Sequence, residues 1–306
     1  MTPRLAVVVP CYNEEEMLPL SMPVFLDMLD TLRKSGEVKS DSFLLFVDDG
    51  STDSTWRYIA DMHFMRNDVR GIRLSRNFGQ QNALYAGIMK AGESCDIVVT
   101  MDADLQDDVQ VLPEMLEKYK KGSEIVYGVR FCRNMDTGLK KYSAALFYRL
   151  LKFIDPRTVR GHADFRLMSS RVVELLKEHR EQNLYLRGIV SDMGFESSEV
   201  MYERRGRDAG CTGYSAGKMV ELALNGLMRS ERLQNLFYKA PVYAFAAIVC
   251  ELIISCGKGS GKGAVISGRS MAALILVSQA MLLSMESAVL KEARQLPRYI
   301  VCDTAD

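Results

Sequence analysis

The chain has 306 residues, of which 48% are hydrophobic, and its 39 basic residues balance its 39 acidic residues. It is long enough to bury one large core or two smaller ones, and its net charge of zero argues against a nucleic-acid-binding protein. The seven cysteines show no CxxC pair or regular spacing, which indicates reduced thiols on a cytosolic face. The apolar run near the N-terminus is short and ends in acidic residues, so we expect no export signal.

Short apolar runs alternate with amphipathic stretches over the first 130 residues or so. Apolar runs rich in β-branched residues predict strands over residues 5–10, 42–48, 69–74, 95–101 and 123–130. Helical spacing predicts helices over residues 14–35, 54–67, 81–92 and 111–121. Because each strand is an unbroken apolar run, this alternation predicts a parallel sheet covered by helices on both faces.

A polar cluster follows each predicted strand. The five clusters read CYNEEE, DDGSTD, SRNFGQQ, DADLQDD and GVRFCR. In parallel sheets of this kind, ligands bind beyond the carboxyl ends of the strands. We therefore expect the five clusters to meet at one edge of the sheet and to form one site.

Two carboxylates stand two residues apart directly after the fourth predicted strand, Asp102 and Asp104 in VTMDADLQDD. They can point at one ligand if the chain turns there. Oxygen ligands without a nearby His or Cys suit Mg²⁺ or Mn²⁺ rather than zinc. The alternative is that these acids cap the following helix. A second acidic pair at a neighbouring strand end, Asp48 and Asp49, favours a metal–diphosphate site instead.

The pattern changes after about residue 134. Residues 139–154 are amphipathic, with basic residues among aromatic ones, and fit equally a helix packed on the core and a helix lying on a membrane. Two apolar stretches within residues 240–285, joined by a Gly/Lys loop, predict a helical hairpin. Each stretch is near the ~20 residues needed to span a bilayer, but the three polar residues Glu251, Arg269 and Gln279 interrupt them. The hairpin could therefore span the membrane, lie on it, or pair with a partner or a second copy.

Nine motifs between residues 5 and 230 match those of one enzyme family in the family's order. They are VVVPCYNE, VDDGSTDST, RNFGQQNALYAG, MDADLQD, YGVR, ADFRLMSSRV, YLRG, YERRGRDAG and YSAGKM. In these motifs the chain resembles family 2 glycosyltransferases, more narrowly those that act on polyprenyl phosphates, such as bactoprenol glucosyltransferases and dolichol-phosphate mannose synthases. The resemblance implies the GT-A nucleotide-sugar-binding fold, an α/β fold with a Rossmann-like, mostly parallel sheet, over residues 1–230. It also implies a membrane-associated or transmembrane helical hairpin and tail over residues 231–306.

The resemblance further implies a role for each matching residue. The metal, Mg²⁺ or Mn²⁺, would be held by Asp102, Asp104 and Gln106. The donor would be bound by Pro10, Tyr12, Glu14, Asp48, Asp49, Asp102, Arg205 and Arg207. The acceptor phosphate would be met by Arg130, Lys141 and Arg166. The expected catalytic residues are Asp164, Asp104 and Arg130, with Asp164 at the position of a proposed base.

The implied reaction is the inverting transfer of a hexose from a UDP- or GDP-sugar to polyprenyl (undecaprenyl) phosphate. A phosphate monoester has a second pKa of about 6 and is largely dianionic at neutral pH, so Asp164 could act as a base or could orient Arg166. The expected partners are a nucleotide sugar, the lipid and the cytoplasmic face of the cell membrane, with no nucleic acid, and with self-association left open. Two alternatives remain: a soluble family 2 glycosyltransferase with a saccharide hydroxyl acceptor, and a non-catalytic membrane partner that binds nucleotide sugars.

Overall fold

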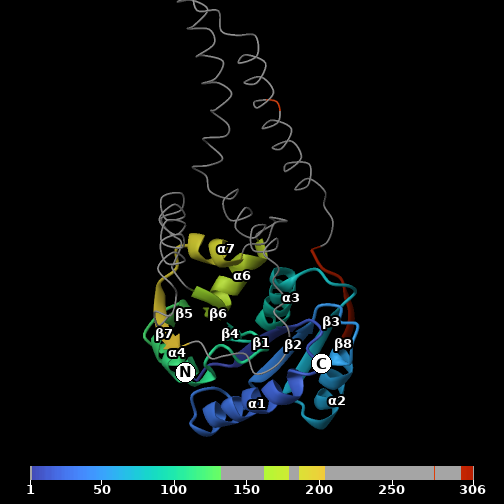
Figure 1. Cartoon of the computed structure of the whole chain (residues 1–306). Helices are drawn as coiled ribbons and strands as arrows, with labels where there is room; N and C mark the ends of the chain where they lie inside the picture. The colour runs from blue at the N-terminus through green and yellow to red at the C-terminus, as the bar shows by residue number, and fades with distance from the viewer. Residues whose placement is uncertain (1, 132–161, 179–185, 204–278, 280–297, 306) are drawn as a thin grey trace, which may run out of the picture. The chain divides into compact units, whose positions relative to one another are not determined.

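The computed structural model describes residues 2–131, 162–178, 186–203, 279 and 298–305. The strands and helices named below all lie in one compact unit, to which the chain contributes Met1–Tyr148, Arg157–Ser215 and Pro297–Asp306. This unit is a layered α/β structure with a central sheet (Figure 1). The α/β class and the mostly parallel sheet expected from the sequence are therefore confirmed.

The sheet has eight strands in the order β7-β5-β6-β4-β1-β2-β3-β8. The strands are β1 (Leu5–Cys11), β2 (Phe43–Asp48), β3 (Val69–Leu74), β4 (Ile97–Thr100), β5 (Ile125–Phe131), β6 (His162–Ser169), β7 (Ser197–Glu203) and β8 (Val301–Ala305). Strand β1 pairs in parallel with β2 and β4, β2 with β3, and β5 with β7. Two strands run antiparallel to their neighbours, namely β6 between β4 and β5, and β8 beside β3.

Helices cover both faces of the sheet (Figure 1). One hydrophobic cluster packs the first face against α1 (Leu18–Lys34), α2 (Thr55–Met65), η1 (Val109–Val111) and α4 (Leu112–Lys120). The other cluster packs the second face against α3 (Gln80–Gly92), α6 (Ser170–Glu178) and α7 (Leu186–Asp192). Strand β1 serves both, because side chains alternate along a strand: Leu5, Val7 and Val9 face the first cluster, and Ala6 and Val8 the second.

The five strands and four helices predicted from the sequence are all present, within a few residues of the expected bounds. The helix predicted over residues 14–35 ends at Lys34, and Gly36 shortly after it takes the left-handed φ of 72° that glycine adopts without strain. The sequence analysis did not predict β6, β7 or β8. Strand β6 carries two buried charged residues, and the exposed residues of β7 and β8 break their apolar runs.

The end of the chain belongs to the sheet. Strand β8 pairs with β3, and Trp56 Nε1 on α2 donates a hydrogen bond to Asp303 Oδ2 at 3.1 Å. The expected division had grouped these last residues with the hairpin, in a second domain over residues 231–306. The boundary near residue 230 stays a prediction, because residues 204–278 lie outside the described ranges.

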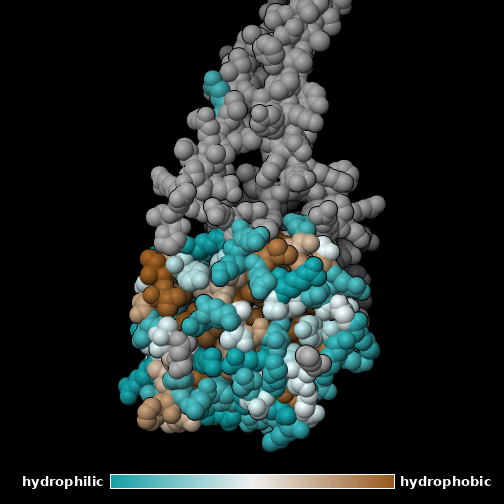
Figure 2. Space-filling view, turned by 180° about the vertical axis from the view of Figure 1, so that it is seen from behind, coloured by the Kyte–Doolittle hydropathy of each residue, from teal (hydrophilic) through white to brown (hydrophobic). Residues whose placement is uncertain are grey.

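On the face that Figure 2 shows, the described residues are largely hydrophilic, with hydrophobic side chains in separate patches. The most exposed large hydrophobic side chains are Phe64, at 91%, and Met65, at 74%, at the end of α2. Among the described residues, no helix combines the length and the apolar character that a membrane crossing requires. The predicted amphipathic segment, residues 139–154, lies outside the described ranges, as does the predicted hairpin except for residue 279.

A buried carboxylate holds the loop between β3 and α3. Asp49, directly after β2, is 2% exposed, and its two oxygens accept hydrogen bonds from Phe78 N and Gly79 N, each at 2.8 Å. Burial raises the pKa of Asp49 from 3.8 to about 6, although the two backbone N–H groups act in the opposite direction. The first turn of α3 is therefore fixed against the end of β2.

The substitution Gly87→Ala tests the packing of α3 on the sheet. A Cβ atom at Gly87 would lie 2.3 Å from Val8 Cγ1 and 2.7 Å from Val47 Cγ2, and valine side chains in a sheet have little freedom to move aside. Overpacking of this kind costs about 1–3 kcal/mol, so we expect a lower free energy of unfolding despite the better helix propensity of alanine. Urea unfolding followed by the fluorescence of Trp56, the only tryptophan, measures the change. Lys90→Ala on the same helix is the control, with an expected change below about 0.5 kcal/mol. Equal stabilities would contradict the close approach.

The raised pKa of Asp49 predicts a pH dependence of stability. The unfolded chain loses this proton near pH 4 and the folded protein near pH 6, so stability falls between those values by at most about 1.4 kcal/mol per pH unit. Asp49→Asn removes this fall but loses one backbone hydrogen bond, which costs about 1 kcal/mol. We therefore expect the gap in stability, variant minus wild type, to be most negative at pH 4 and to rise to zero or above by pH 6. Urea titrations at several pH values measure the gap, and Asp61→Asn on the exposed face of α2 should show no such trend. A gap that stays constant would contradict the burial of an ionisable Asp49.

Candidate active site

The loops after β1 and β2 are joined by hydrogen bonds. Asn13 N donates to Ser51 Oγ at 2.9 Å, and Thr52 N donates to Asn13 Oδ1 at 3.0 Å. Glu14 N donates to Thr55 Oγ1 at 2.8 Å. These contacts bring the CYNEEE and DDGSTD clusters together at the carboxyl end of the sheet, as the sequence predicted.

The residues expected to bind the nucleotide lie around these loops. Tyr12 is 45% exposed, whereas Pro10 and Glu14 are partly buried. The carboxylate of Asp48 is buried, accepts a hydrogen bond from a backbone N–H of the same loop, and forms an ion pair with Arg73 Nε at 3.1 Å. Burial raises the pKa of Asp48. An exposed aromatic ring beside buried acids offers one surface for stacking and another for polar contacts.

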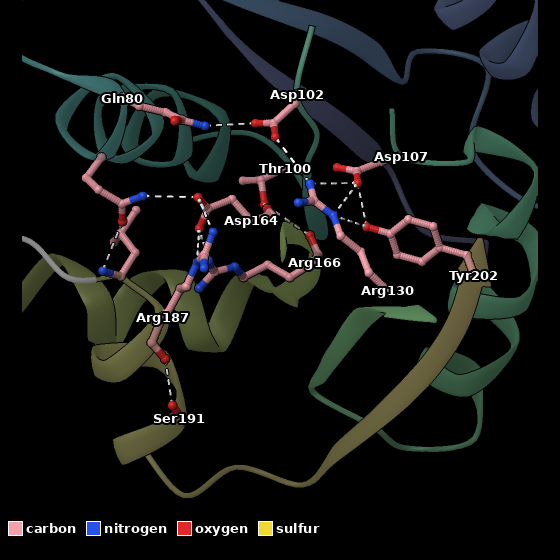
Figure 3. A network of polar contacts seen from close by, with 12 residues as sticks. Gln80, Thr100, Asp102, Asp107, Arg130, Asp164, Arg166, Arg187, Ser191 and Tyr202 are labelled. Carbon is pink, nitrogen blue, oxygen red and sulfur yellow. Dashed lines mark hydrogen bonds and ion pairs between the residues drawn. The ribbon is translucent and has the colours of Figure 1, made fainter. Parts of the chain in front are cut away.

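Asp102 lies at the centre of the carboxyl edge (Figure 3). Its Oδ1 accepts a hydrogen bond from Gln80 Nε2 at 2.8 Å, and its Oδ2 lies 3.7 Å from Arg130 Nη2. Burial, followed by the neighbouring carboxylates Asp107, Asp164 and Asp104, raises the pKa of Asp102 to about 7, although Arg130 acts in the opposite direction. The side chain nevertheless remains 25% exposed, so a ligand can reach it.

Arg130 on β5 connects Asp102 to a second acid (Figure 3). Its Nε and Nη2 donate to Asp107 Oδ1 at 3.2 and 3.0 Å. Tyr202 on β7 donates its hydroxyl hydrogen to the same oxygen and lies 3.2 Å from Arg130 Nε. The other oxygen of Asp107 is buried, and no described residue donates a hydrogen bond to it. The guanidinium of Arg130 is thus held at one orientation beside Asp102.

Asp104 and Gln106 lie in the turn that follows Asp102. Asp104 Oδ1 accepts a hydrogen bond from Gln106 N at 3.2 Å, and Leu105 between them takes a left-handed φ of 55°, which is uncommon for a residue with a side chain. Within the described ranges, no three Asp, Glu, His or Cys side chains are grouped as a metal site. Asp102 and the turn after it nevertheless offer two carboxylates and one amide. One or two carboxylates are enough for Mg²⁺ when substrate phosphates supply further oxygen ligands.

Asp164 on β6 is bound by three side chains. Its Oδ1 accepts from Arg166 Nη2 at 2.6 Å and from Arg187 Nε at 3.1 Å. Its Oδ2 accepts from Arg187 Nη2 and from Gln81 Nε2, each at 3.1 Å. Each carboxylate oxygen thus already accepts two hydrogen bonds, an arrangement suited to orienting the arginines.

The two arginines bound to Asp164 differ in their access to ligand. The side chain of Arg166 is 2% exposed, and its Nη1 is buried without a hydrogen-bond acceptor among the described residues. Burial lowers the pKa of Arg166. The side chain of Arg187 is 30% exposed. Of the two, Arg187 is therefore the one that is open to a phosphate. The expected contact between Arg166 and the acceptor phosphate would require the residues around Arg166 to move.

The sequence analysis missed several members of this network, namely Gln80, Gln81, Asp107, Arg187 and Tyr202. Gln80, Gln81, Asp107 and Arg187 fall within quoted motifs, and Tyr202 is the first residue of YERRGRDAG, but no spacing rule connects them with Asp102 or Asp164. Three residues with expected roles, Lys141, Arg205 and Arg207, lie outside the described ranges.

Solved structures provide weak likenesses. The glucosyl-3-phosphoglycerate synthase of Mycobacterium tuberculosis matches with a TM-score of 0.47 and 19% identity, covering 74% of this chain and 80% of that one. A mannosyltransferase of Pyrobaculum calidifontis, solved with GDP-mannose and Mn²⁺, matches with a TM-score of 0.46 and 16% identity, covering 97% and 89%. With TM-scores below 0.5, these likenesses assign neither fold nor substrate.

Sequence comparisons are stronger. The chain is 45% identical over 225 residues to an uncharacterized glycosyltransferase of Bacillus subtilis, YkoT, covering 74% of this chain and 67% of the relative. It is 36% identical over 226 residues to a prophage bactoprenol glucosyl transferase homolog of Escherichia coli, covering 73% and 71%, and equally identical to the bactoprenol glucosyl transferase of Shigella phage SfV. The model of glycosyl transferase family 2 matches residues 6–176. The resemblance noted from the motifs is therefore confirmed: the chain is a glycosyltransferase that belongs to family 2.

Proposed function

We propose that this glycosyltransferase transfers a hexose from a UDP- or GDP-sugar to polyprenyl phosphate, with inversion at the anomeric carbon and with Mg²⁺ or Mn²⁺. The observation that carries the proposal is the arrangement at the carboxyl edge of the sheet. There Asp102 faces Arg130, and Asp164, on the neighbouring strand β6, is bound by Arg187 of α7. One group suits a metal-bound diphosphate and the other a second anion.

The residues around Asp102 fit a hard divalent cation. Burial and then three neighbouring carboxylates raise the pKa of Asp102 to about 7, so a bound cation would favour the ionised form of this side chain. Asp107 adds a buried oxygen that accepts no hydrogen bond from the described residues. Asp102, Asp104 and Gln106 would hold the ion. Bound there, it would neutralise charge on the leaving diphosphate.

The chain's own residues would stabilise the departing nucleotide. Charge builds on the outer phosphate as the sugar leaves, and arginine suits this charge because its planar fork binds phosphate through two hydrogen bonds. Arg130 is fixed by Asp107 and Tyr202, so it needs little reorganisation when the phosphate arrives. Tyr12 and the acids after β2 would bind the nucleoside.

A phosphate acceptor explains the surroundings of Asp164 better than a hydroxyl acceptor does. A hydroxyl nucleophile needs a base with a free lone pair, whereas both oxygens of Asp164 accept hydrogen bonds from arginine. A lipid phosphate is already largely dianionic at neutral pH. We propose that Asp164 orients Arg187 toward the acceptor phosphate. The bactoprenol glucosyl transferases among the relatives support the same acceptor.

A lipid acceptor requires that the enzyme reach a membrane. We propose that it works at the cytoplasmic face of the cell membrane, where the basic amphipathic segment and the C-terminal hairpin would bring it to the lipid. Arg205 and Arg207 would close on the donor, and Lys141 would meet the acceptor phosphate. Self-association through the hairpin is compatible with this arrangement.

Release of nucleoside diphosphate tests the proposed reaction. The full chain, purified in detergent, would be incubated with a panel of UDP- and GDP-sugars, with undecaprenyl phosphate, and with or without Mn²⁺. We expect release from one donor that requires both the lipid and the metal. Asp104→Ala should lower the rate by at least about 100-fold, because it removes charge stabilisation of the leaving group.

The controls separate the proposed acceptor from the alternatives. Undecaprenol, which lacks the phosphate, should not replace the lipid, and Asp61→Ala on the exposed face of α2 should keep the wild-type rate. Release with a saccharide acceptor in place of the lipid would overturn the polyprenyl-phosphate assignment. Nucleotide-sugar binding without turnover under any of these conditions would overturn the transfer reaction itself.

The substitution Asp164→Asn tests whether this residue acts as a base. If it orients Arg187, we expect a measurable residual rate, lower by about 10- to 100-fold, together with a raised KM for the lipid. Steady-state kinetics against lipid concentration measure both, and Asp192→Asn, exposed on the same helix as Arg187, is the control. A rate no higher than the uncatalysed one, with donor binding intact, would show instead that Asp164 removes a proton.

A further inference from the structure

Four consecutive residues, Phe78–Gln81, contact three carboxylates of the carboxyl edge. The backbone N–H groups of the first two hold Asp49, after β2. The side chains of the next two hold Asp102, after β4, and Asp164, on β6. One short segment at the start of α3 therefore connects the proposed nucleotide, metal and acceptor positions.

Gln81 connects three elements through one amide group. Its Nε2 donates to Asp164 Oδ2 at 3.1 Å, and its Oε1 accepts from Leu186 N, at the start of α7, at 3.2 Å. Because the amide donates on one side and accepts on the other, its orientation is determined. Arg187, the next residue of α7, binds the same carboxylate. The position of Asp164 and that of Arg187 thus both depend on Gln81.

Gln80 acts on the other half of the site. Its Nε2 donates to Asp102 Oδ1 at 2.8 Å, while Arg130 approaches Oδ2 of the same carboxylate. Side chains of consecutive helical residues point about 100° apart, with 3.6 residues per turn, so Gln80 and Gln81 reach different strands from one turn. Buried residues of α3 pack this helix on the sheet, which makes its first turn a rigid support.

We propose that Gln80 and Gln81 are positioning residues, Gln80 for the donor and metal side through Asp102 and Gln81 for the acceptor side through Asp164. The first turn of α3 then fixes the separation between the leaving diphosphate and the attacking phosphate. A misplacement of either reactant by about 1 Å is enough to slow such a reaction by about 100-fold. This inference rests on the proposed function, since it assigns the two carboxylates to the two substrates.

Two methionine substitutions separate the roles, because methionine keeps the length of glutamine and removes its hydrogen bonds. Gln80→Met should raise by about tenfold both the donor KM and the Mn²⁺ concentration for half-maximal rate, and leave the lipid KM within about twofold. Gln81→Met should raise the lipid KM by about tenfold and leave the donor KM within about twofold. A merely structural role would shift all of these constants together with the melting temperature.

Gln81→Glu sharpens the test of the acceptor side. Glutamate keeps the length and shape of glutamine and can still accept from Leu186 N, but it places a carboxylate against Asp164 instead of a donor. We expect it to impair lipid use at least as much as Gln81→Met. Gln110→Met, on the exposed surface of η1, removes an amide outside the network and is the matched control for all three variants.

Binding measurements without turnover distinguish failure of the inference from failure of the proposed function. Calorimetric titration of the full chain with UDP and Mn²⁺, and separately with undecaprenyl phosphate in detergent micelles, should show weakened nucleotide binding only in Gln80→Met and weakened lipid binding only in the Gln81 variants. If the wild type binds both nucleotide and lipid but releases no nucleoside diphosphate, the proposed reaction is overturned. The inference is then decided by whether the Gln80 and Gln81 variants lose binding of different ligands. Binding within about twofold of wild type in all variants, or parallel losses of both ligands, would overturn the assignment of the two glutamines.

Discussion

The concentration of carboxylates at one edge of the sheet is the constraint on which the rest of this structure depends. Asp102 is surrounded by three further acids, and their repulsion together with burial raises its pKa to about 7. Such a group is costly to fold unless cations balance it. The protein supplies Arg130 on one side and Arg166 and Arg187 on the other. A diphosphate-bound metal completes this balance in the proposed mechanism, so the same charges that cost stability would bind the donor.

The direction of β6 decides which residues share that edge. The neighbouring strands β4 and β5 bring their carboxyl ends to the site, and β6 runs antiparallel between them. Its first residues therefore lie where its neighbours end, and Asp164 comes close to residues more than 50 positions earlier in the chain. Thr100, the last residue of β4, donates its hydroxyl hydrogen to the carbonyl oxygen of Asp164. The donor side and the acceptor side of the proposed site are thus adjacent strands of one sheet.

In this arrangement two carboxylates have different roles, one as a candidate cation ligand and one as a group that orients arginines. Asp102 keeps part of its surface open, as suits a ligand of a cation. Asp164 is almost fully enclosed by hydrogen-bond donors, as suits a group that holds arginines in place. The same residue type therefore takes different roles through its neighbours. The proposed acceptor phosphate is already negatively charged. Arginines held in place to bind it are therefore more useful than a base that removes a proton.

The sequence by itself determined the alternation of five strands with four helices, the acidic clusters at the strand ends and the family, because apolar runs, their periods and local motifs are properties of neighbouring residues. It did not reveal β6, whose buried Asp164 and Arg166 interrupt its apolar run, or the edge strand β8, which is mostly exposed. Nor could it show that Gln80 and Gln81 bind two different carboxylates, or that Arg187 rather than Arg166 is accessible. Those facts depend on strand order and direction. These bring together residues distant in the chain, and only the tertiary structure fixes them.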